Sequence, residues 1–523
     1  MATFTLLIAL LRNAFEIAAN EAKNENEDTN EMTAQSLADD LYNNYLTYTD
    51  TRKRPPSREF RLTMSEVDKD FFRDLLNGQN PSPRAESHRR LLYAWDYINQ
   101  QLILPIVNDS NLTIEEQLNR LQNLKDNILE HSVIIHIVCD NMDEAYQLFE
   151  VLNDRGKELA IGDYLRSTTL ELLDSNPVYQ DRVSECWDDI LSRKNADKYI
   201  KDYLTSHIAT LKKSNIHRQF QKKFFTFISN NDNLERDVRD RVINLKNMFD
   251  VYEMLKEGIY PYQNPTANSW QRNRLTLLIK YLDHRHCIPF LMALFECGTE
   301  NDFIESVMTI EKFVFRYITV SGLRANKLSS VYKTHILNMR RKGVFNLNEF
   351  KNDLCHLLNV DCTNQRFAEA IENNLKYKSD SKTIKKMRYF LTTLEDHYSW
   401  YTQTNRPQIP RPSMNVLYNL DNLEIEHVYP QNASQQIASL EPLKNTIGNL
   451  TFWSPNDNKI AGNNPFTQKQ IYYQKSNIAI TRILGNLRDW DVTTIEERKN
   501  FYIDIAQHVF NIYPNPIPMS TTS

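Results

Sequence analysis

Residues 423–430 read LEIEHVYP, and residues 447–459 read IGNLTFWSPNDNK. The first segment alternates apolar and polar residues and is stopped by a proline, which is typical of a short β-strand. The second segment begins with another strand-like run. Ser454 followed by Pro455 then has the composition of a helix N-terminus. We therefore predict a strand, a loop, a second strand and a helix, with the two strands packed as a hairpin on the helix.

Three side chains of this unit have the chemistry that phosphodiester hydrolysis needs, namely a base that activates water and oxygen ligands that hold a cation. His427 titrates near neutrality and can take the proton, while Glu426 and the Asn458 carbonyl are hard oxygen ligands of the kind that Mg²⁺ or Mn²⁺ prefers. A strand histidine alone is usually a structural or surface residue. The order and spacing of all three residues therefore carry the prediction of a metal-dependent nuclease site.

Upstream of this unit the composition changes at a proline-rich segment. Residues 405–412 read NRPQIPRP, and three prolines in six residues favour an extended connector over a helix. We place a linker at residues 405–415 and a C-terminal domain at 416–523. Amphipathic helical periodicity runs through residues 162–400, so we assign a helical domain to residues 176–404.

The first 175 residues are also predicted to be mostly helical. Apolar residues recur at helical spacing from Leu6 to Ile17, and this segment lacks the basic start and the cleavage site of a signal peptide. Residues 132–138, SVIIHIV, are rich in β-branched side chains and predict a buried strand, the one strand that we assign before residue 400. The polar residues 20–33 and the basic residues 51–61 are predicted loops.

The overall composition favours a mainly α protein. Only 10 glycines occur in 523 residues, which disfavours a turn-rich all-β fold or a series of phosphate-binding glycine loops. The six cysteines form no CxxC pair, so we expect reduced thiols and no structural zinc. The net charge of -5 provides no global attraction to DNA, and we find no segment that reads as a membrane anchor. We expect a cytoplasmic protein.

Two further features each allow two interpretations. At Asn153, Arg155 and Gly156 the chain has the composition of a helix end, where the glycine suits a left-handed cap and the arginine can hold a phosphate or a carboxylate. On composition, a capped helix end with a local ion pair is favoured over a ligand site. Two basic clusters are either solvated faces or surfaces beside a nuclease groove, and they comprise Lys376, Lys378, Lys382, Lys385, Lys386 and Arg388, and Arg340, Arg341 and Lys342.

The C-terminal segments resemble a known nuclease family. The run IEHVYPQ, followed by LKNTIGNLTFWSPNDNKIAGNNPFTQKQIYYQKS, is similar to the HNH or His-Me finger nuclease domain of GmrSD-like, modification-dependent restriction endonucleases. This resemblance spans about residues 420–510 and implies an α+β domain of the ββα-metal type. It implies that His427 is the general base, that Glu426 and Asn458 hold the metal, and that Asn449 braces the loop that orients the histidine. It also suggests phosphate contacts at Lys459, Lys469 and Lys475.

The upstream region is similar to the GmrS-like half of the same family through FTLLIALLRN, SHRRLLYAWDYI and FEVLNDRGKELAIGDYLRS. The resemblance implies that residues 1–175 are a truncated, ParB-like α/β domain with a helical insertion, and that Asn153, Arg155 and Gly156 lie near a nucleotide site. An Asp-Gly-Gln-Gln-Arg segment precedes the first helix in that family and does not precede it here. Nucleoside triphosphate binding is therefore expected only with a complementing N-terminal segment, for example a separate ParB-like NTPase subunit.

Three functions remain open from the sequence. The leading one is a Mg²⁺-dependent endonuclease of a restriction or phage-defence system that cuts foreign, modified DNA. The second is a subunit that cuts DNA only when it is assembled with a separate ParB-like NTPase. The third is a folded, inactive remnant that binds DNA or a partner without cutting.

Overall fold

The computed structural model describes residues 1–52, 54–64, 68–133, 137–138, 148, 161–211, 216–224, 234–454 and 462–513. Helices dominate this described part of the chain, which confirms the expectation of a mainly α protein. The chain divides into two compact units, Met1–Leu159 with Leu191–Lys194, and Ala160–Ile190 with Asn195–Ser523. The finer division at residues 175, 404 and 415 stays a prediction.

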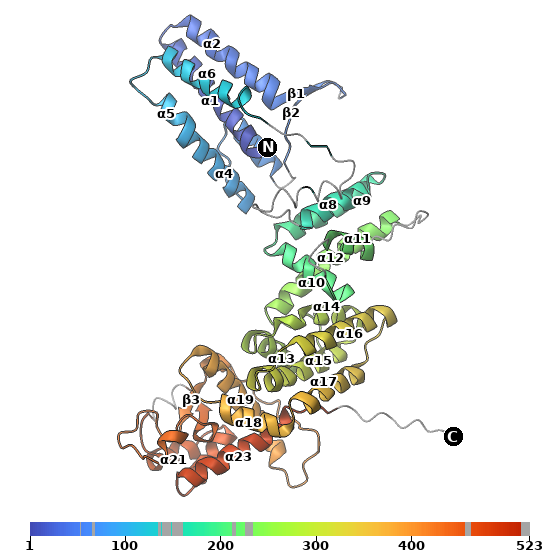
Figure 1. Cartoon of the computed structure of the whole chain (residues 1–523), viewed down its shortest axis with the longest axis vertical. Coiled ribbons are helices and arrows are strands. Elements are labelled where there is room, and N and C mark those ends of the chain that lie inside the picture. The colour runs from blue at the N-terminus through green and yellow to red at the C-terminus, as the bar shows by residue number, and fades with distance from the viewer. Residues whose placement is uncertain are drawn as a thin grey trace, which may run out of the picture. The chain divides into compact units, whose positions relative to one another are not determined.

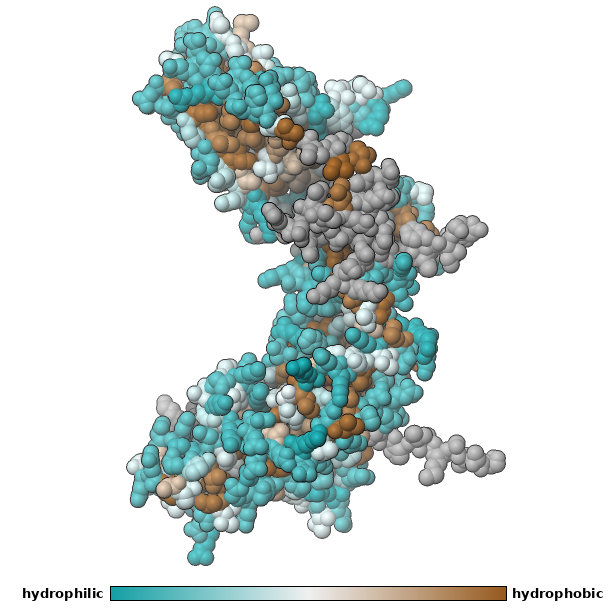
Figure 2. Space-filling model, in the orientation of Figure 1, coloured by the Kyte–Doolittle hydropathy of each residue, from teal (hydrophilic) through white to brown (hydrophobic). Residues whose placement is uncertain are grey.

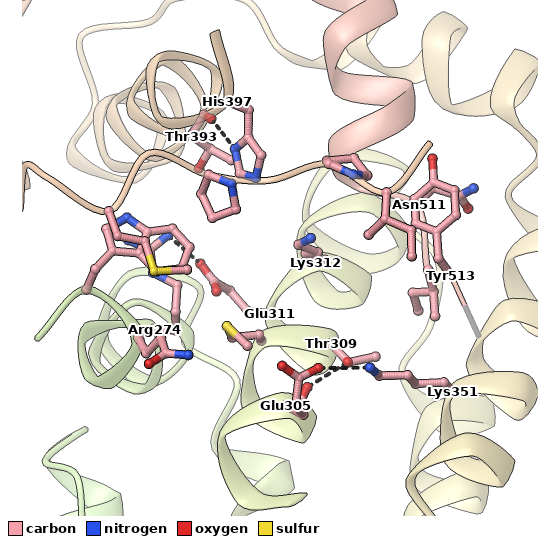
Figure 3. Close-up of a pocket in the computed structure, with 18 of the residues that line it drawn as sticks. Arg274, Glu305, Thr309, Glu311, Lys312, Lys351, Thr393, His397, Asn511 and Tyr513 are labelled. Carbon is pink, nitrogen blue, oxygen red and sulfur yellow. Dashed lines mark hydrogen bonds and ion pairs between the residues drawn. The ribbon is translucent and has the colours of Figure 1, made fainter. Parts of the chain in front are cut away.

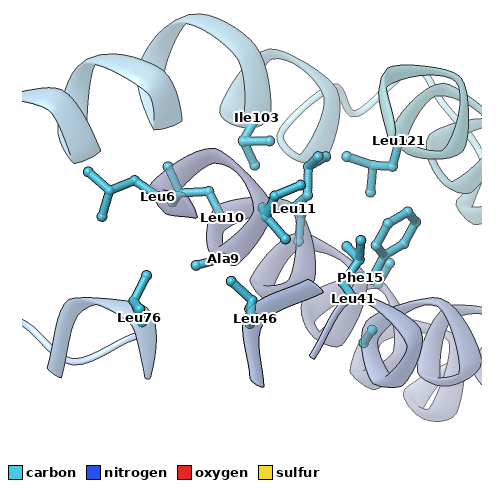
Figure 4. Close-up of a cluster of buried hydrophobic side chains, with 14 of the residues drawn as sticks. Leu6, Ala9, Leu10, Leu11, Phe15, Leu41, Leu46, Leu76, Ile103 and Leu121 are labelled. Carbon is cyan, nitrogen blue, oxygen red and sulfur yellow. The ribbon is translucent and has the colours of Figure 1, made fainter. Parts of the chain in front are cut away.

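The first unit is built around its first helix, α1, against which α2, α4 and α6 pack (Figure 1). Leu6, Leu10, Leu11 and Phe15 of α1 are fully enclosed by this packing, as Figure 4 shows. The spacing of these residues places them on one face of a helix, so burying that face stabilises the unit. The elements are α1 (Ala2–Asn24), α2 (Asp28–Asp40), η1 (Leu41–Leu46), β1 (Thr47–Asp50), β2 (Ser57–Phe60), α3 (Lys69–Leu76), α4 (Glu86–Ile98), η2 (Asn99–Ile103), α5 (Leu104–Val107) and α6 (Ile114–Leu129).

The helix α1 is also long and apolar enough to be a candidate membrane span, near the N-terminus of the chain. Half of its most apolar window is buried, which a core helix also shows. Figure 2 shows apolar side chains on the visible face of the first unit, and partly buried residues such as Leu91, Leu92 and Trp95 pack against its core.

Two sequence predictions for the first unit need correction. Residues 20–33 are largely helical and not a loop, because α1 continues to Asn24 and α2 begins at Asp28. Residues 51–61 include β2, which pairs antiparallel with β1 from Thr47↔Phe60 to Asp50↔Ser57. These short strands, TYTD and SREF, are polar, so they lack the apolar alternation that identifies a strand in a sequence.

The strand predicted at residues 132–138 falls mostly outside any described element. Residues 134–136 lie outside the described residues, and the four described ones belong to no helix or strand.

The second unit begins with a long series of helices, in agreement with the predicted periodicity. Several of them start at a side-chain cap. In α15, for example, Thr299 accepts a hydrogen bond from the Asp302 amide while the Asp302 carboxylate accepts one from the Thr299 amide. The helices are α8 (Ile161–Glu171), α9 (Pro177–Ser192), α10 (Ala196–Ile208), α11 (Ile216–Phe224), α12 (Leu234–Lys256), α13 (Ser269–Thr276), η3 (Leu277–Tyr281), η4 (Arg285–Cys287), α14 (Ile288–Cys297), α15 (Glu300–Phe313), η5 (Val314–Val320), α16 (Asn326–Lys342), α17 (Leu347–Asp361), α18 (Asn364–Asn374) and α19 (Ser381–Tyr401).

The remainder of the second unit packs against α18 and α19 (Figure 1). The carboxylate of Glu395 on α19 accepts hydrogen bonds from the amides of Ala479 and Ile480, at 2.8 and 2.9 Å, and so caps α22. The elements here are η6 (Leu420–Asn422), β3 (Glu424–His427), η7 (Glu441–Leu443), η8 (Ile447–Asn449), β4 (Leu450–Trp453), α21 (Phe466–Gln474), α22 (Ala479–Arg482), η9 (Ile483–Asn486) and α23 (Val492–Val509).

The proline-rich segment between α19 and η6 contains no described helix or strand and lies against α19. The Trp400 indole donates to the Pro407 carbonyl at 2.9 Å, and the Ser413 amide donates to the Asp396 carbonyl at 2.6 Å. An extended segment bound in this way connects the helices to the β3–β4 hairpin without a free linker.

Buried histidines of the helical region predict acid sensitivity. Burial lowers the pKa of His207 and His397 to about 3 and that of His284 to about 4, from 6.5. The native state keeps these rings neutral while the unfolded chain protonates them below pH 6.5. The free energy of unfolding should therefore be highest above pH 6.5 and fall as the pH drops toward 4, by about 2 kcal/mol per ring between pH 7 and pH 5.

Urea unfolding of wild type, His284→Gln and His286→Gln at both pH values measures this effect. His284 is buried and His286 is exposed. Between pH 7 and pH 5, the unfolding free energy of His284→Gln should fall by about 2 kcal/mol less than that of wild type. That of His286→Gln should fall as in wild type. Equal losses in all three proteins would contradict the assignment.

Candidate active site

The strands β3 and β4 form the antiparallel hairpin that the sequence predicts, with Glu426 opposite Thr451 and His427 opposite Leu450. The second strand is shorter than predicted, because Ile447–Asn449 form a 3₁₀ turn and not a strand. All four residues of β4 are buried. In β3, Glu426 and His427 are buried, whereas Glu424 and Ile425 are partly exposed.

His427 is 6% exposed and is held on two sides. Its Nε2 lies 3.2 Å from Asn445 Oδ1, and its ring meets the Tyr377 ring edge to face with centroids 4.6 Å apart. Since the amide oxygen can only accept, Nε2 carries the proton in this arrangement and Nδ1 keeps the lone pair. Burial lowers the pKa of His427 to about 4, and Asn445 opposes this shift. The ring is neutral at pH 7 and available as a base.

Asn449 is fully buried, and its side chain contacts the chain two residues after His427. Its Oδ1 accepts from the Tyr429 amide at 2.7 Å and from the Trp490 indole at 3.0 Å. Its Nδ2 donates to the carbonyls of Tyr429 and Lys444, at 3.0 and 2.8 Å. One side chain thus binds the chain just after His427 to the loop just before η8.

Glu426 and Lys469 form a buried ion pair, with Glu426 Oε1 2.6 Å from Lys469 Nζ. The same ammonium donates to the His427 carbonyl at 2.9 Å, and the Tyr473 hydroxyl donates to Glu426 Oε1 at 2.9 Å. Burial raises the pKa of Glu426, and Lys469 acts in the opposite direction. Lys469 is 1% exposed and its ammonium binds Glu426 and the His427 carbonyl, and the phosphate contact suggested at this residue stays a prediction.

The helix α23 closes the site from behind. Arg498 Nη1 donates to the carbonyls of Gly448 and Leu450, both at 2.8 Å. A Cβ at Gly448 would lie 2.2 Å from the Ile495 carbonyl oxygen, so only glycine lets α23 approach the turn this closely. Gly448 is adjacent to Asn449, and this close contact therefore also fixes the position of the bracing amide.

A cavity of about 150 Å³ opens where these groups meet. Glu426, His427 and Lys469 line it on the hairpin side, and Gln431 and Asn463 add amide groups. The predicted metal ligand Asn458 and the predicted phosphate contact Lys459 lie outside the described residues. The same holds for Asn153, Arg155 and Gly156, the residues predicted to handle nucleotide. Lys475 is exposed on the segment after α21.

The first basic cluster starts beside the site. Tyr377, whose ring contacts His427, lies between Lys376 and Lys378, and its amide donates to the Asn445 carbonyl at 2.9 Å. Further along, α19 presents Lys382, Lys385 and Lys386 to a cavity of about 650 Å³ that Lys280 also lines. In the other basic cluster, the Arg340 guanidinium already binds Glu296 and the Ser206 carbonyl.

The two residues that contact the His427 ring could not be found from the sequence. Asn445 and Tyr377 are separated from the histidine by 18 and 50 positions, and neither stands in a strand or helix. The Glu426–Lys469 pair was also missed. One pattern in the sequence could have indicated a buried lysine. In QKQIYY, which follows an apolar strand, the lysine stands among aromatic residues.

Residues 361–505 match the family model for the C-terminal domain of GmrSD restriction endonucleases. This match confirms the resemblance that the sequence analysis drew for the C-terminal part of the chain. It covers α18, α19, both strands of the hairpin and most of α23. The search of curated proteins finds no match.

Among the described residues, no group of three or more histidine, cysteine, aspartate or glutamate side chains could hold a metal ion, so Glu426 would need amide oxygens as further ligands. Both recorded side-chain bonds to this carboxylate fall on Oε1, which leaves Oε2 without a side-chain donor among the described residues. The amide oxygens of Gln431 and Asn463 on the cavity wall are also of the kind that Mg²⁺ accepts. The Lys469 ammonium acts against a cation here, since it already neutralises the carboxylate.

The bracing function of Asn449 predicts a large stability effect that a neighbouring asparagine lacks. Asn449→Ala leaves four buried polar groups without partners and should cost about 3 kcal/mol or more of unfolding free energy. Asn445 is exposed and makes one side-chain bond, to His427. Asn445→Ala should therefore cost under about 1 kcal/mol.

Denaturant unfolding of both variants beside wild type measures the two costs. Similar stability losses in the two variants would show that Asn449 does not hold the turn.

Proposed function

Starting from the restriction-endonuclease match of residues 361–505, we propose that this chain is a metal-dependent DNA endonuclease of a restriction or phage-defence system. The observation that carries the proposal is the buried, neutral imidazole of His427 beside the Glu426 carboxylate at the end of β3, braced by Asn449. The substrate we propose is foreign, modified DNA.

His427 acts as the base in this proposal. Its Nδ1 lone pair takes a proton from water, the water oxygen attacks the phosphorus, and the P–O ester bond on the opposite side breaks as the leaving oxygen takes a proton from solvent. A pKa of about 4 makes the free imidazole a weak base. The negative charge of a bound phosphodiester raises that pKa, because it stabilises the imidazolium.

Two residues would hold the metal, Glu426 through Oε2 and Asn458 through its carbonyl. A bound Mg²⁺ or Mn²⁺ neutralises the negative charge that develops on the phosphate oxygens. Lys469 keeps the Glu426 carboxylate ionised and pointed at the cavity, since it pairs with Oε1 and is itself fixed to the His427 carbonyl. The cation and the base are then held by adjacent residues of one strand.

The lysines of α19 supply the DNA contact that the net charge of -5 does not. Lys376 and Lys378 flank the tyrosine that touches His427, and Lys382, Lys385 and Lys386 continue the same charge along the helix. A local run of cations that starts beside the catalytic histidine suits a phosphate backbone. These residues favour a DNA substrate over a small phosphodiester.

The second candidate function is a subunit that cuts DNA only with a separate ParB-like NTPase, and the similarity of FEVLNDRGKELAIGDYLRS to GmrS-like proteins favours it. In that case Asn153, Arg155 and Gly156 complete a nucleotide site with the partner. The third, an inactive DNA-binding remnant, predicts binding without cleavage. Cleavage assays with and without nucleoside triphosphate separate the three.

The central test is His427→Ala assayed on modified and unmodified phage DNA with Mg²⁺. Loss of the base should lower the cleavage rate by about 10²- to 10⁴-fold. The chain should stay folded, because the imidazole contributes one ring contact and one hydrogen bond. His286→Ala, at an exposed histidine remote in sequence, is the control. Mg²⁺-dependent cutting by folded His427→Ala at the wild-type rate would refute the catalytic assignment.

Metal binding is tested separately with Glu426→Gln and Glu424→Gln. The two glutamates lie on the same strand, but Glu424 is half exposed and 4.0 Å from Arg388. Glu426→Gln should raise the Mg²⁺ concentration for half-maximal cleavage about tenfold or more, with partial rescue by Mn²⁺. Glu424→Gln should leave it unchanged.

Glu426→Gln also leaves the buried Lys469 ammonium without a countercharge and is expected to unfold more easily. The double variant Glu426→Gln with Lys469→Met removes that cost and should show the same metal defect. Wild-type Mg²⁺ dependence in the double variant would place the cation elsewhere.

A further inference from the structure

Another cavity, of about 240 Å³, lies among the helices of the second unit (Figure 3). It shares no lining residue with the cavity at His427. Its walls come from α13, α15 and α19, from the proline-rich segment and from the residues that follow α23. Pockets for drug-sized molecules usually span about 300–1,000 Å³. This cavity is therefore suited to a small molecule and too small for a strand of DNA.

Most charges around the cavity are paired within the protein. Lys351 binds Glu305 at 2.8 Å, and Arg274 binds Glu311 at 3.4 Å while it stacks on Trp270. Asp396, deeper in the same network, accepts from the Trp270 indole at 2.9 Å.

Lys312 is the exception. Its Nζ makes no hydrogen bond or ion pair with any described residue, and no dashed line reaches it in Figure 3. Burial lowers the pKa of this ammonium, while Glu311 and Glu305 act in the opposite direction at longer range. The Lys312 side chain is part-buried and lines the cavity, so its ammonium is a positive charge that an anion entering the cavity can pair with.

Two further polar atoms around the same cavity lack partners. His397 is 2% exposed, its Nδ1 donates to the Thr393 carbonyl at 2.9 Å, and its Nε2 has no hydrogen bond. The ring is neutral, so Nε2 presents a lone pair that accepts hydrogen bonds. The buried Arg274 Nε also lacks an acceptor. Buried polar atoms normally have a hydrogen-bond partner, so two without one at the same cavity indicate that a bound molecule supplies the partners.

We propose that this cavity binds a small organic anion, whose carboxylate or phosphate monoester pairs with Lys312 and whose hydroxyl or amino group donates to His397 Nε2. Ile409, Pro410 and Pro412 of the proline-rich segment supply an apolar wall for the body of the molecule. A purely apolar ligand would leave the ammonium unpaired, and a cation would meet it directly. The unfilled donor and the unfilled acceptor together select an anion that also carries a hydrogen-bond donor.

The test measures binding of four probes to the full chain by calorimetry, namely inorganic phosphate, phenyl phosphate, benzoate and 4-hydroxybenzoate. We expect saturable binding of at least one aromatic anion, and tighter binding of 4-hydroxybenzoate than of benzoate because only the former can donate to His397. The phosphate and carboxylate arms distinguish the two anionic groups. Absence of saturable binding by all four probes would overturn the proposal.

Lys312→Met should weaken the binding of each bound probe by about tenfold or more, while Lys333→Met, at an exposed lysine on α16, should not. Unchanged probe affinity in Lys312→Met would show that this ammonium does not bind the anion.

Discussion

The side-chain amide of Asn449 is the constraint on which the geometry of the hairpin depends. A buried amide can donate twice and accept twice, and here all four possibilities are used by groups from three separate stretches of chain. Two of these bonds hold both backbone groups of Tyr429, two residues after His427. A carboxylate at this position would lose the two donated bonds, and an aliphatic side chain would lose all four. Few other side chains can therefore place the chain after His427 at this angle.

The same part of the molecule also buries two charges, which lowers its stability unless they are paired with each other. Glu426 and Lys469 lie at 4% and 1% exposure, so each depends on the other for compensation. Such a pair contributes little net stability compared with apolar residues of the same size. Its geometry has another consequence, since Lys469 also binds the His427 carbonyl and so links the carboxylate to the strand that carries the base. The ion pair therefore adds little stability but fixes the carboxylate relative to the imidazole.

Local patterns predicted the parts of this protein that local physics determines. The alternation of LEIEHVYP predicts β3, and the helical periodicity of residues 162–400 predicts the series of helices. The β1–β2 hairpin was missed because its strands are polar, and residues 20–33 were misassigned because polar residues also form the exposed surface of helices. The partners of His427 could not be predicted, because Asn445 and Tyr377 reach it only through tertiary packing. Spacing in the sequence contains no information on such contacts.

Three consecutive residues of α19 lie between the hairpin and the cavity that Lys312 lines. Glu395 caps α22 beside the hairpin, Asp396 binds the Trp270 indole, and His397 faces the cavity that holds Lys312. Successive residues of a helix point about 100° apart, so one turn of α19 faces three different neighbours. The carbonyl of Asp396 also accepts from Ser413, which ties the proline-rich segment to the same turn. Because this segment is both a wall of the Lys312 cavity and the lead into β3, a molecule bound in that cavity would contact the chain that positions the hairpin, with α19 as the rigid element between them.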